Sequence, residues 1–204
     1  MTGEQTSADR NRDDILVVLR DVMPDQGSIL EIASGAGKHA VRFAEEFAPR
    51  VWQPSEYDPD RINAMRARFS GLDLPNLRDP VLLDARAESW PVEAGWADLP
   101  IRMIYNVNMI HIAPWEAGLG LLAGAGKLLA PGGVLYLYGP YRVGGAHTGP
   151  GNVAFDQSLR ARDPSWGIRD LDDVTAAAAA HGLQRAAVIA MPADNLSVVF
   201  RRTS

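Results

Sequence analysis

Cysteine is absent from this chain of 204 residues, which excludes disulfide bonds, thiolate nucleophiles and cysteine-based zinc sites. Histidine is scarce, and no two histidines are spaced as a pair of metal ligands on one helix face, so the sequence predicts no metal site. The four histidines are His39, His111, His147 and His181. The formal net charge is −5, which disfavours nucleic acid as a partner because nucleic-acid binders normally present a basic face.

Long apolar runs are also missing, because glycine, proline or a charged residue interrupts each stretch before it reaches membrane-spanning length. The first nine residues are polar and show no secretory pattern. We therefore expect a cytoplasmic protein without a membrane partner. With 47% hydrophobic and 22% charged residues, the chain suits one globular domain, predicted over residues 9–204 after a disordered tail at residues 1–8.

What the chain does contain is an alternation of strand and helix patterns. Strands are predicted at 28–33, 51–55, 81–83, 101–107 and 134–138, and helices at about 9–22, 39–47, 59–69, 114–129 and 170–181. A short helix is expected near 155–160, and two consecutive strands, 183–191 and 196–201, close the chain. This order predicts an α/β protein with a mostly parallel sheet, helices on both faces and an antiparallel C-terminal hairpin.

Three groups of residues stand where the first three predicted strands end, and open α/β sheets bind ligands beyond such ends. Gly35 and Gly37 follow the first strand, so the backbone can turn sharply and the next helix can meet an anionic group. Glu56 ends the second strand, where its carboxylate can accept hydrogen bonds from both hydroxyls of a ribose. Asp84 ends the third strand, placed for the amino group of an adenine.

Two cofactors fit this arrangement. The segment from Gly35 to Ala40 matches the pattern G-x-G-x-x-G/A of nicotinamide dinucleotide sites. Glu31, however, lies inside the strand just before the loop, where a carboxylate suits the ammonium of a methionine moiety and repels a pyrophosphate. The chain also closes with a strand pair and opens no second catalytic domain. S-adenosylmethionine is therefore favoured, with a nicotinamide-dependent oxidoreductase as an open alternative.

The stretch ILEIASGAGKHAVRFA resembles the first motif of class I S-adenosylmethionine-dependent methyltransferases, and LLAPGGVLYLYGP resembles their helix-to-fifth-strand segment. Longer stretches resemble a small methyltransferase-like family whose members mostly carry the description domain of unknown function. These stretches include WQPSE, NMIHIAPWEA, LYGPYR, NVAFDQSLRARDPSWGIRD and MPADNLSVVFRR. The similarity runs from about residue 9 to residue 202.

The resemblance implies a Rossmann-like class I methyltransferase fold with a seven-stranded sheet, S-adenosylmethionine as cofactor and S-adenosylhomocysteine as product. It places Glu56 at the ribose, and Asp84 with Ala85 at the adenine. The residues that it places around the methionine part are Glu31, Ala33, Gly35 and Gly37. The family usually has aspartate where Glu56 stands, and Asp58, two residues further on, is the alternative residue for the ribose.

Candidate residues for methyl transfer follow the fourth predicted strand. Methyl transfer from a sulfonium is an in-line displacement, so the protein mainly supplies alignment and a dry site, with a base where the nucleophile carries a proton. His111 has the pKa range of such a base, and the alternatives are that it caps the helix beginning at Pro114 or packs beside Trp115. Asn108 is a candidate for binding the cofactor or the acceptor, and the alternative is a turn residue.

A glycine-rich and aromatic segment, 139–167, follows the fifth predicted strand and is a candidate substrate lid. Its candidate acceptor contacts are Tyr141, Arg142, Asn152, Arg160 and Trp166. Arg160 and Arg169 are candidates for binding an anionic substrate, although ion pairs with neighbouring aspartates explain them more simply. The predicted function is methyl transfer to a small-molecule acceptor, and the alternative is a sensor that binds S-adenosylmethionine without transferring its methyl group.

Overall fold

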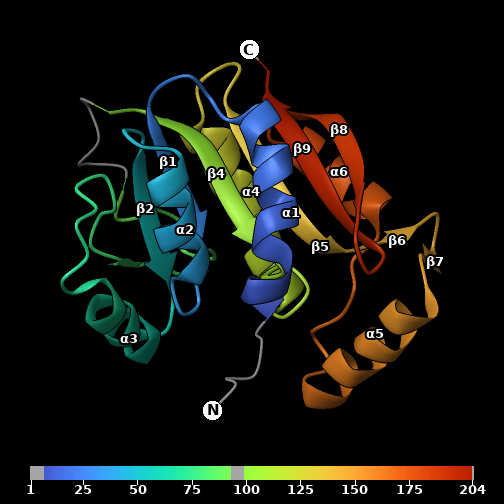
Figure 1. The fold of residues 1–204 in the computed structure, drawn as a ribbon. Helices are drawn as coiled ribbons and strands as arrows, with labels where there is room; N and C mark the ends of the chain where they lie inside the picture. The colour runs from blue at the N-terminus through green and yellow to red at the C-terminus, as the bar shows by residue number, and fades with distance from the viewer. Residues whose placement is uncertain (1–6, 93–98, 204) are drawn as a thin grey trace.

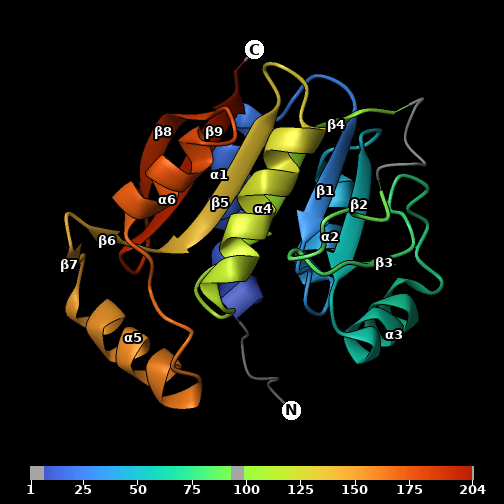
Figure 2. The same ribbon diagram turned by 180° about the vertical axis from the view of Figure 1, so that it is seen from behind.

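The computed structural model describes residues 7–92 and 99–203. Helices lie on both faces of a central sheet, as the two opposite views show (Figure 1 and Figure 2). The helices are α1 (Ser7–Val22), α2 (Lys38–Glu46), α3 (Pro59–Phe69), α4 (Trp115–Leu128), α5 (Pro150–Arg162) and α6 (Leu171–Ala179). The strands are β1 (Ser28–Ile32), β2 (Val51–Glu56), β3 (Val81–Leu82), β4 (Ile101–Val107), β5 (Val134–Pro140), β6 (Arg142–Val143), β7 (Ala146–His147), β8 (Leu183–Met191) and β9 (Asn195–Arg202).

The main sheet has seven strands in the order β3-β2-β1-β4-β5-β9-β8. The pairings from β3 to β5 are parallel, and β9 runs antiparallel between β5 and β8. The chain moves outward from β1 to β2 and β3 and then returns to β4 on the other side of β1. This reversal makes the boundary between β1 and β4 the switch point at which open α/β sheets bind ligands. The predicted α/β class, parallel sheet and antiparallel C-terminal hairpin are confirmed.

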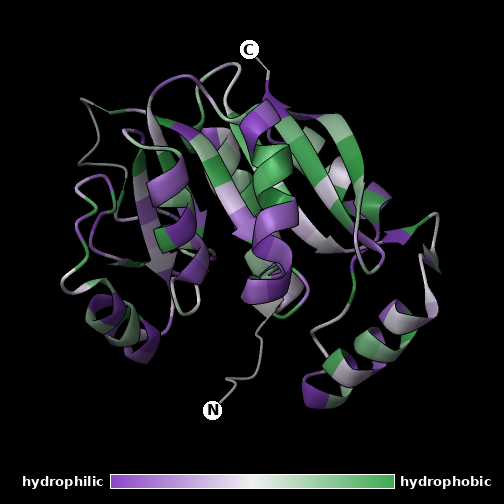
Figure 3. Ribbon diagram, in the orientation of Figure 1, coloured by the Kyte–Doolittle hydropathy of each residue, from purple (hydrophilic) through white to green (hydrophobic). Residues whose placement is uncertain are grey.

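Two hydrophobic cores flank the sheet, because successive side chains of a strand point to opposite faces. Ile29 of β1 packs in the core under α1 and α2, whereas Leu30 and Ile32 pack in the core under α4 and α6. Figure 3 shows the apolar colour on parts of β4, β8 and β9 and in the middle of α1, whose first turns are hydrophilic. No helix in the described ranges is long and apolar enough to span a bilayer.

Glycine residues let α4 approach the loop that follows β3. A Cβ atom on Gly120 would collide with the backbone of Ala85, and one on Gly124 would collide with the ring of Trp90. Trp90 is buried in the core under α4, and Ala117 of the same helix packs there as well. The small residues of α4 therefore bring the ends of β3 and β4 to one crevice.

Most predicted boundaries agree with the structure to within two residues, and the lid segment is the exception. The helix expected near 155–160 is α5, which spans Pro150–Arg162, and the β6-β7 hairpin was not predicted. The reason is that α5 buries polar Asn152 and Asp156 beside Leu159, so its sequence shows no apolar periodicity. The predicted tail at 1–8 is corrected at its end because α1 begins at Ser7, and residues 1–6 lie outside the described part.

Candidate cofactor and acceptor site

A cavity of about 390 Å³ opens where β1, β2, β3 and β4 end, and its volume suits a small ligand. Its lining residues are Ile32, Ala33, Glu56, Tyr57, Arg61, Leu83, Asp84, Ala85, Arg86, Val107, Met109, Ile112, Ala113, Pro114, Ala117, Asp163 and Trp166. Five of them were predicted from the sequence as site residues: Ala33, Glu56, Asp84, Ala85 and Trp166. The structure thus brings together the strand-end residues of three strands.

Glu56 ends β2 and forms part of the cavity wall. One of its carboxylate oxygens accepts a hydrogen bond from the backbone N–H of Gly35, and the other accepts one from the N–H of Tyr57, both at 2.9 Å. An ionised carboxylate has about four acceptor positions, so about two remain. Those two match the two hydroxyls of a ribose. Asp58, the alternative residue, instead caps α3 by accepting from the N–H of Asp60 at 2.9 Å.

Asp84 lies in the cavity wall beside Arg86. The Arg86 guanidinium donates to both oxygens of Asp84, the shortest contact being 2.7 Å, and its backbone N–H donates at 2.9 Å. These hydrogen bonds hold the pKa of Asp84 below its usual range. Asp84 is therefore a fixed, ionised acceptor at the end of β3, as an adenine amino group requires.

Glu31 lies in β1 just before the glycine loop and is buried, with 3% of its surface exposed. One carboxyl oxygen accepts a hydrogen bond from the indole N–H of Trp52 at 2.7 Å. Burial raises the pKa of Glu31 to about 8, so this carboxyl is protonated at neutral pH unless a cation lies beside it. Glu31 does not line the cavity, and its contact with a cofactor stays a prediction.

The glycine loop turns the chain from β1 into α2 through three residues with positive φ: Ala33 at 58°, Gly35 at 58° and Gly37 at 72°. A Cβ atom on Gly37 would lie only 2.8 Å from the ring of Phe69, so this position has no room for a side chain. Gly37 provides no side-chain cap for α2, and a helix N-terminus is a place where an acceptor group of a ligand can bind. Gly35 and Gly37 are not among the cavity-lining residues.

Two asparagines shape the end of β4. The Asn106 side chain donates to the Ile32 carbonyl at 2.9 Å and so ties β4 to β1 across the switch point. Asn108 has a φ of 62°, which asparagine tolerates better than most residues, and its N–H donates to the Tyr138 carbonyl at 2.8 Å. This geometry supports the turn role of Asn108, and its contact with cofactor or acceptor stays a prediction.

His111 is fully buried and does not line the cavity. Its Nδ1 accepts a hydrogen bond from the backbone N–H of Arg169 at 3.3 Å, and its ring meets that of Tyr141 edge-on at 5.0 Å between centroids. Burial lowers the pKa of His111 to about 3, so the ring is neutral and carries its proton on Nε2. The general-base role stays a prediction, and the ring packs against Tyr141.

Three other candidates of the lid segment and the loop after it do not line the cavity: Asn152, Arg160 and Arg169. Asn152 donates to the Thr148 hydroxyl at 2.9 Å and to the Asp194 carbonyl at 3.0 Å. Arg160 forms the expected ion pair with a neighbouring aspartate, Asp156, at 3.1 Å. The Arg169 guanidinium forms no such pair at hydrogen-bond distance. It donates to the carbonyls of Ile110, Ala113 and Ser165, at 2.8 to 2.9 Å.

Comparison with known proteins identifies the family. The family described as "Protein of unknown function (DUF938)" matches residues 3–202. The chain belongs to the DUF938 family. The family resemblance found in the sequence is thereby confirmed.

Three of the solved structures with the same fold are described as methyltransferases or as a putative methyltransferase. One is the apo form of the S-adenosylmethionine-dependent methyltransferase SibL, at 18% identity and a TM-score of 0.76, which covers 97% of this chain and 56% of its own. Human N-acetylserotonin methyltransferase in complex with S-adenosylmethionine is 12% identical, with a TM-score of 0.78. The match covers 98% of this chain and 54% of that protein. A putative methyltransferase in complex with the Trm112 activator of Haloferax volcanii is 14% identical, with a TM-score of 0.73. The match covers 97% of this chain and 92% of that protein.

These identities are low, so the likeness shows the fold alone. The DUF938 chain spans about half the length of the first two of these proteins. It therefore matches only part of each of them, and their activities are not carried over with the fold.

Several cavity residues were missed in the sequence. Tyr57 directly follows Glu56, and Met109, Ile112 and Ala113 follow β4. The strand-end argument that selected Glu56 and Asp84 applies to these positions too, so the signal was present. Asp163 lies in the predicted lid segment, where the sequence suggested it only as an ion-pair partner for an arginine.

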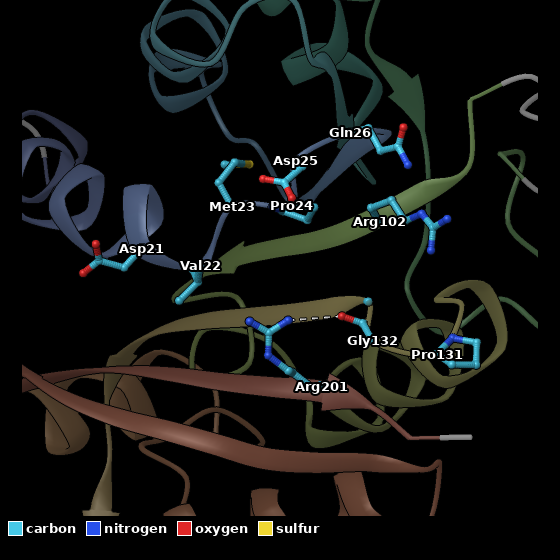
Figure 4. A pocket seen from close by; sticks show the side chains of 11 residues that line it. Asp21, Val22, Met23, Pro24, Asp25, Gln26, Arg102, Pro131, Gly132 and Arg201 are labelled. Carbon is cyan, nitrogen blue, oxygen red and sulfur yellow. Dashed lines mark hydrogen bonds between the residues drawn. The ribbon is translucent and has the colours of Figure 1, made fainter.

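A second cavity, of about 380 Å³, lies where the amino ends of β1, β4 and β5 meet the end of α1 (Figure 4). Arg102, Arg201, Asp21 and Asp25 line it, and Arg201 donates to the Gly132 carbonyl at 3.2 Å. It contains none of the predicted site residues. It also lies at the opposite strand ends from those at which α/β sheets bind ligands.

Proposed function

We propose that this chain binds S-adenosylmethionine in the cavity at the ends of β1 to β4 and transfers its methyl group to a small-molecule acceptor. The observation that carries the proposal is Glu56, which two backbone N–H groups hold in the cavity wall with two acceptor positions left over. We also propose that the protein is cytoplasmic.

Each part of the cofactor has a matching surface. Leu83, Met109 and Ala117 offer an apolar slot for the adenine, and Asp84 offers an acceptor for its amino group. Glu56 serves the ribose. The uncapped first turn of α2 suits the carboxylate of the methionine part. We assign Glu31, which directly precedes the same loop in the sequence, to the ammonium.

The bound cofactor supplies a methyl group on a sulfonium, whose sulfur leaves as a neutral thioether. The chain supplies alignment and a dry wall, and Ile112 and Trp166 are the large apolar side chains on the lid side of the cavity. Transfer needs the acceptor atom in line with the breaking bond, so positioning accounts for much of the rate.

A sensor without transfer activity is the second candidate, and one observation favours it. Among the described lining residues there is no histidine, and Glu56, Asp84 and Asp163 all already accept hydrogen bonds. An acceptor that must lose a proton would therefore have to use a carboxylate that already accepts hydrogen bonds. A nicotinamide-dependent oxidoreductase is less favoured, because Glu31 lies directly before the loop where a pyrophosphate would bind.

Transfer activity is tested with S-adenosylmethionine carrying a radiolabelled methyl group and fractionated cell extract. The proposal expects label in a small-molecule fraction with the wild-type chain and none with Gly35→Arg. A protein that binds S-adenosylmethionine but labels no fraction across many extracts would be a sensor.

A further inference from the structure

We propose that the methyl acceptor carries an oxyanion, a carboxylate or a phosphate, and that four residues under α5 bind it. These residues, the donor cluster, are His111, Tyr141, Arg142 and His147. The inference rests on the proposed function, because it names the substrate class of the same site.

Unpaired buried polar atoms are concentrated in the donor cluster. His111 Nε2, the Tyr141 hydroxyl, Arg142 Nε and His147 Nδ1 are all buried and have no hydrogen-bond partner. Across the described residues the only other such side-chain atom is Arg12 Nε. A buried polar atom without a partner costs free energy and is rare in folded proteins. Four of them on residues that are linked by ring contact, chain neighbourhood or strand pairing indicate missing partners.

The four residues are contiguous in space. The rings of His111 and Tyr141 lie 5.0 Å apart, and Arg142 and His147 are paired across the β6-β7 hairpin. Arg169 joins the two pairs, because its carbonyl accepts from the N–H of Arg142 at 2.9 Å and its N–H donates to His111 Nδ1 at 3.3 Å.

The chemistry of the donor cluster selects its ligand. His111 carries its proton on Nε2, since Nδ1 accepts from Arg169, and the Nε of Arg142 is always a donor. The hydroxyl of Tyr141 also donates. Because the cluster offers donors and the charge of a guanidinium, its best complement is an oxyanion.

The chain itself already places one oxyanion beside the donor cluster. Asp156 of α5 lies with one carboxylate oxygen 3.6 Å from His147 Nε2 and 3.1 Å from Arg160 Nε. The other oxygen accepts from the N–H of Ile168 at 2.6 Å. A carboxylate is therefore already accommodated at the edge of these donors.

The donor cluster is separated from the cofactor cavity by the loop after α5, residues 163–170. Asp163 and Trp166 of this loop line the cavity, and the next residue, Gly167, donates to the His111 carbonyl at 2.9 Å. Figure 2 shows α5 extending beyond the end of the sheet, away from the other helices. An acceptor reaches the cluster when α5 and this loop move aside.

The test uses the whole chain saturated with S-adenosylhomocysteine and three probes of similar shape: benzoate, phenyl phosphate and neutral benzamide. Binding is followed by the ¹⁵N resonances of the four imidazoles. We expect benzoate or phenyl phosphate to move the signals of His111 and His147, and benzamide to leave them in place. Which anion binds more tightly distinguishes a carboxylate from a phosphate acceptor. Arg142→Gln should weaken the anion by about tenfold, since it removes one charge-assisted hydrogen bond.

Arg68→Gln, which changes an exposed arginine of α3, is the matched control and should bind the anions as the wild type does. Signals that no anion moves, or that benzamide moves equally, would overturn the inference. Equal weakening in the control variant would also overturn it, by showing a general charge effect. S-adenosylhomocysteine binding is measured first and separately, so its absence is a failure of the proposed function and not of this inference.

Discussion

The two halves of the site differ in how far the chain has prepared them. On the cofactor half, a cavity is open at the ends of β1 to β4, and Glu56 is held by backbone donors at fixed distances. On the acceptor half, at the donor cluster, buried donors lack partners. Under the proposed function, the cofactor enters a preformed site, whereas the acceptor must rearrange the lid segment.

The largest expected effect is loss of the cofactor half through Gly35→Arg. A Cβ atom there meets only Arg61, at 3.8 Å, so the chain can fold, although an L-residue at a φ of 58° costs about 1 kcal/mol. The long side chain would then occupy the crevice at the loop. We expect S-adenosylhomocysteine affinity to fall about 100-fold or more, equivalent to about 2.7 kcal/mol, by calorimetry. A variant that folds and binds normally would remove the loop from the site.

Glu56→Gln should have the next largest effect, because the amide accepts fewer and weaker hydrogen bonds than the carboxylate. We expect a loss of about 10- to 100-fold in S-adenosylhomocysteine affinity. Asp58→Asn is the matched control, since asparagine keeps the cap of α3, and its affinity should equal that of the wild type. The reverse pattern would assign the ribose to Asp58.

The pH dependence of stability tests Glu31 without any ligand. Its pKa is raised to about 8 by burial, so the folded chain keeps a proton that the unfolded chain loses. The contribution of this proton to the free energy of unfolding is fully present below the ordinary pKa of 4.5, and it is lost as the pH rises toward 8. The pKa values of buried His39 and His111 are lowered to about 4 and about 3, so these histidines change the free energy of unfolding only below their ordinary pKa of 6.5.

Chemical denaturation between pH 6.5 and 8.5 should therefore show the wild type losing on the order of 2 kcal/mol, with Glu31→Gln nearly flat. Saturating S-adenosylmethionine should reduce this slope, because its ammonium stabilises the carboxylate. Parallel pH profiles for wild type and variant would contradict the burial of an acidic proton at Glu31.

On the acceptor half, Tyr141→Phe should raise stability. The hydroxyl is buried without a partner, so its removal relieves a desolvation cost of about 1 kcal/mol. The melting temperature measures this effect. A lower melting temperature would mean that the hydroxyl has a partner in solution, such as an ordered water. S-adenosylhomocysteine affinity should stay unchanged, which separates the two halves.

The smallest effect is expected for Asp84→Asn. This side chain is partly exposed and already bound by Arg86, so solvent and the guanidinium both weaken what it adds to adenine binding. We expect a change of about threefold in S-adenosylhomocysteine affinity. A loss as large as that of Glu56→Gln would make the adenine end as important as the ribose end.

The cofactor half could be predicted from the sequence because its residues follow local rules. Gly35 and Gly37 mark a turn after a buried strand, and Glu56 and Asp84 mark strand ends that a parallel sheet brings to one edge. Residues at the ends of successive strands therefore lie close together in the folded chain. Burial could not be read in the same way, and Glu31 lies behind the loop on Trp52 and not in the open cavity.

The acceptor half could not be predicted to the same extent, because its contacts depend on tertiary packing. The position of His111 after a predicted strand gave no sign that Arg169 and Tyr141 would contact it. In α5 the buried positions are polar, so neither its length nor its buried face shows in the hydrophobic pattern. Residue types there indicated a lid, but not which side chains face the ligand.

Calorimetric titration of the purified chain with S-adenosylmethionine, S-adenosylhomocysteine and NADH tests the central claim most directly. The convergence of the strand-end residues on one cavity predicts one site per chain for the two sulfur compounds, lost in Gly35→Arg, and no heat with NADH. Binding of NADH without binding of either sulfur compound would contradict it.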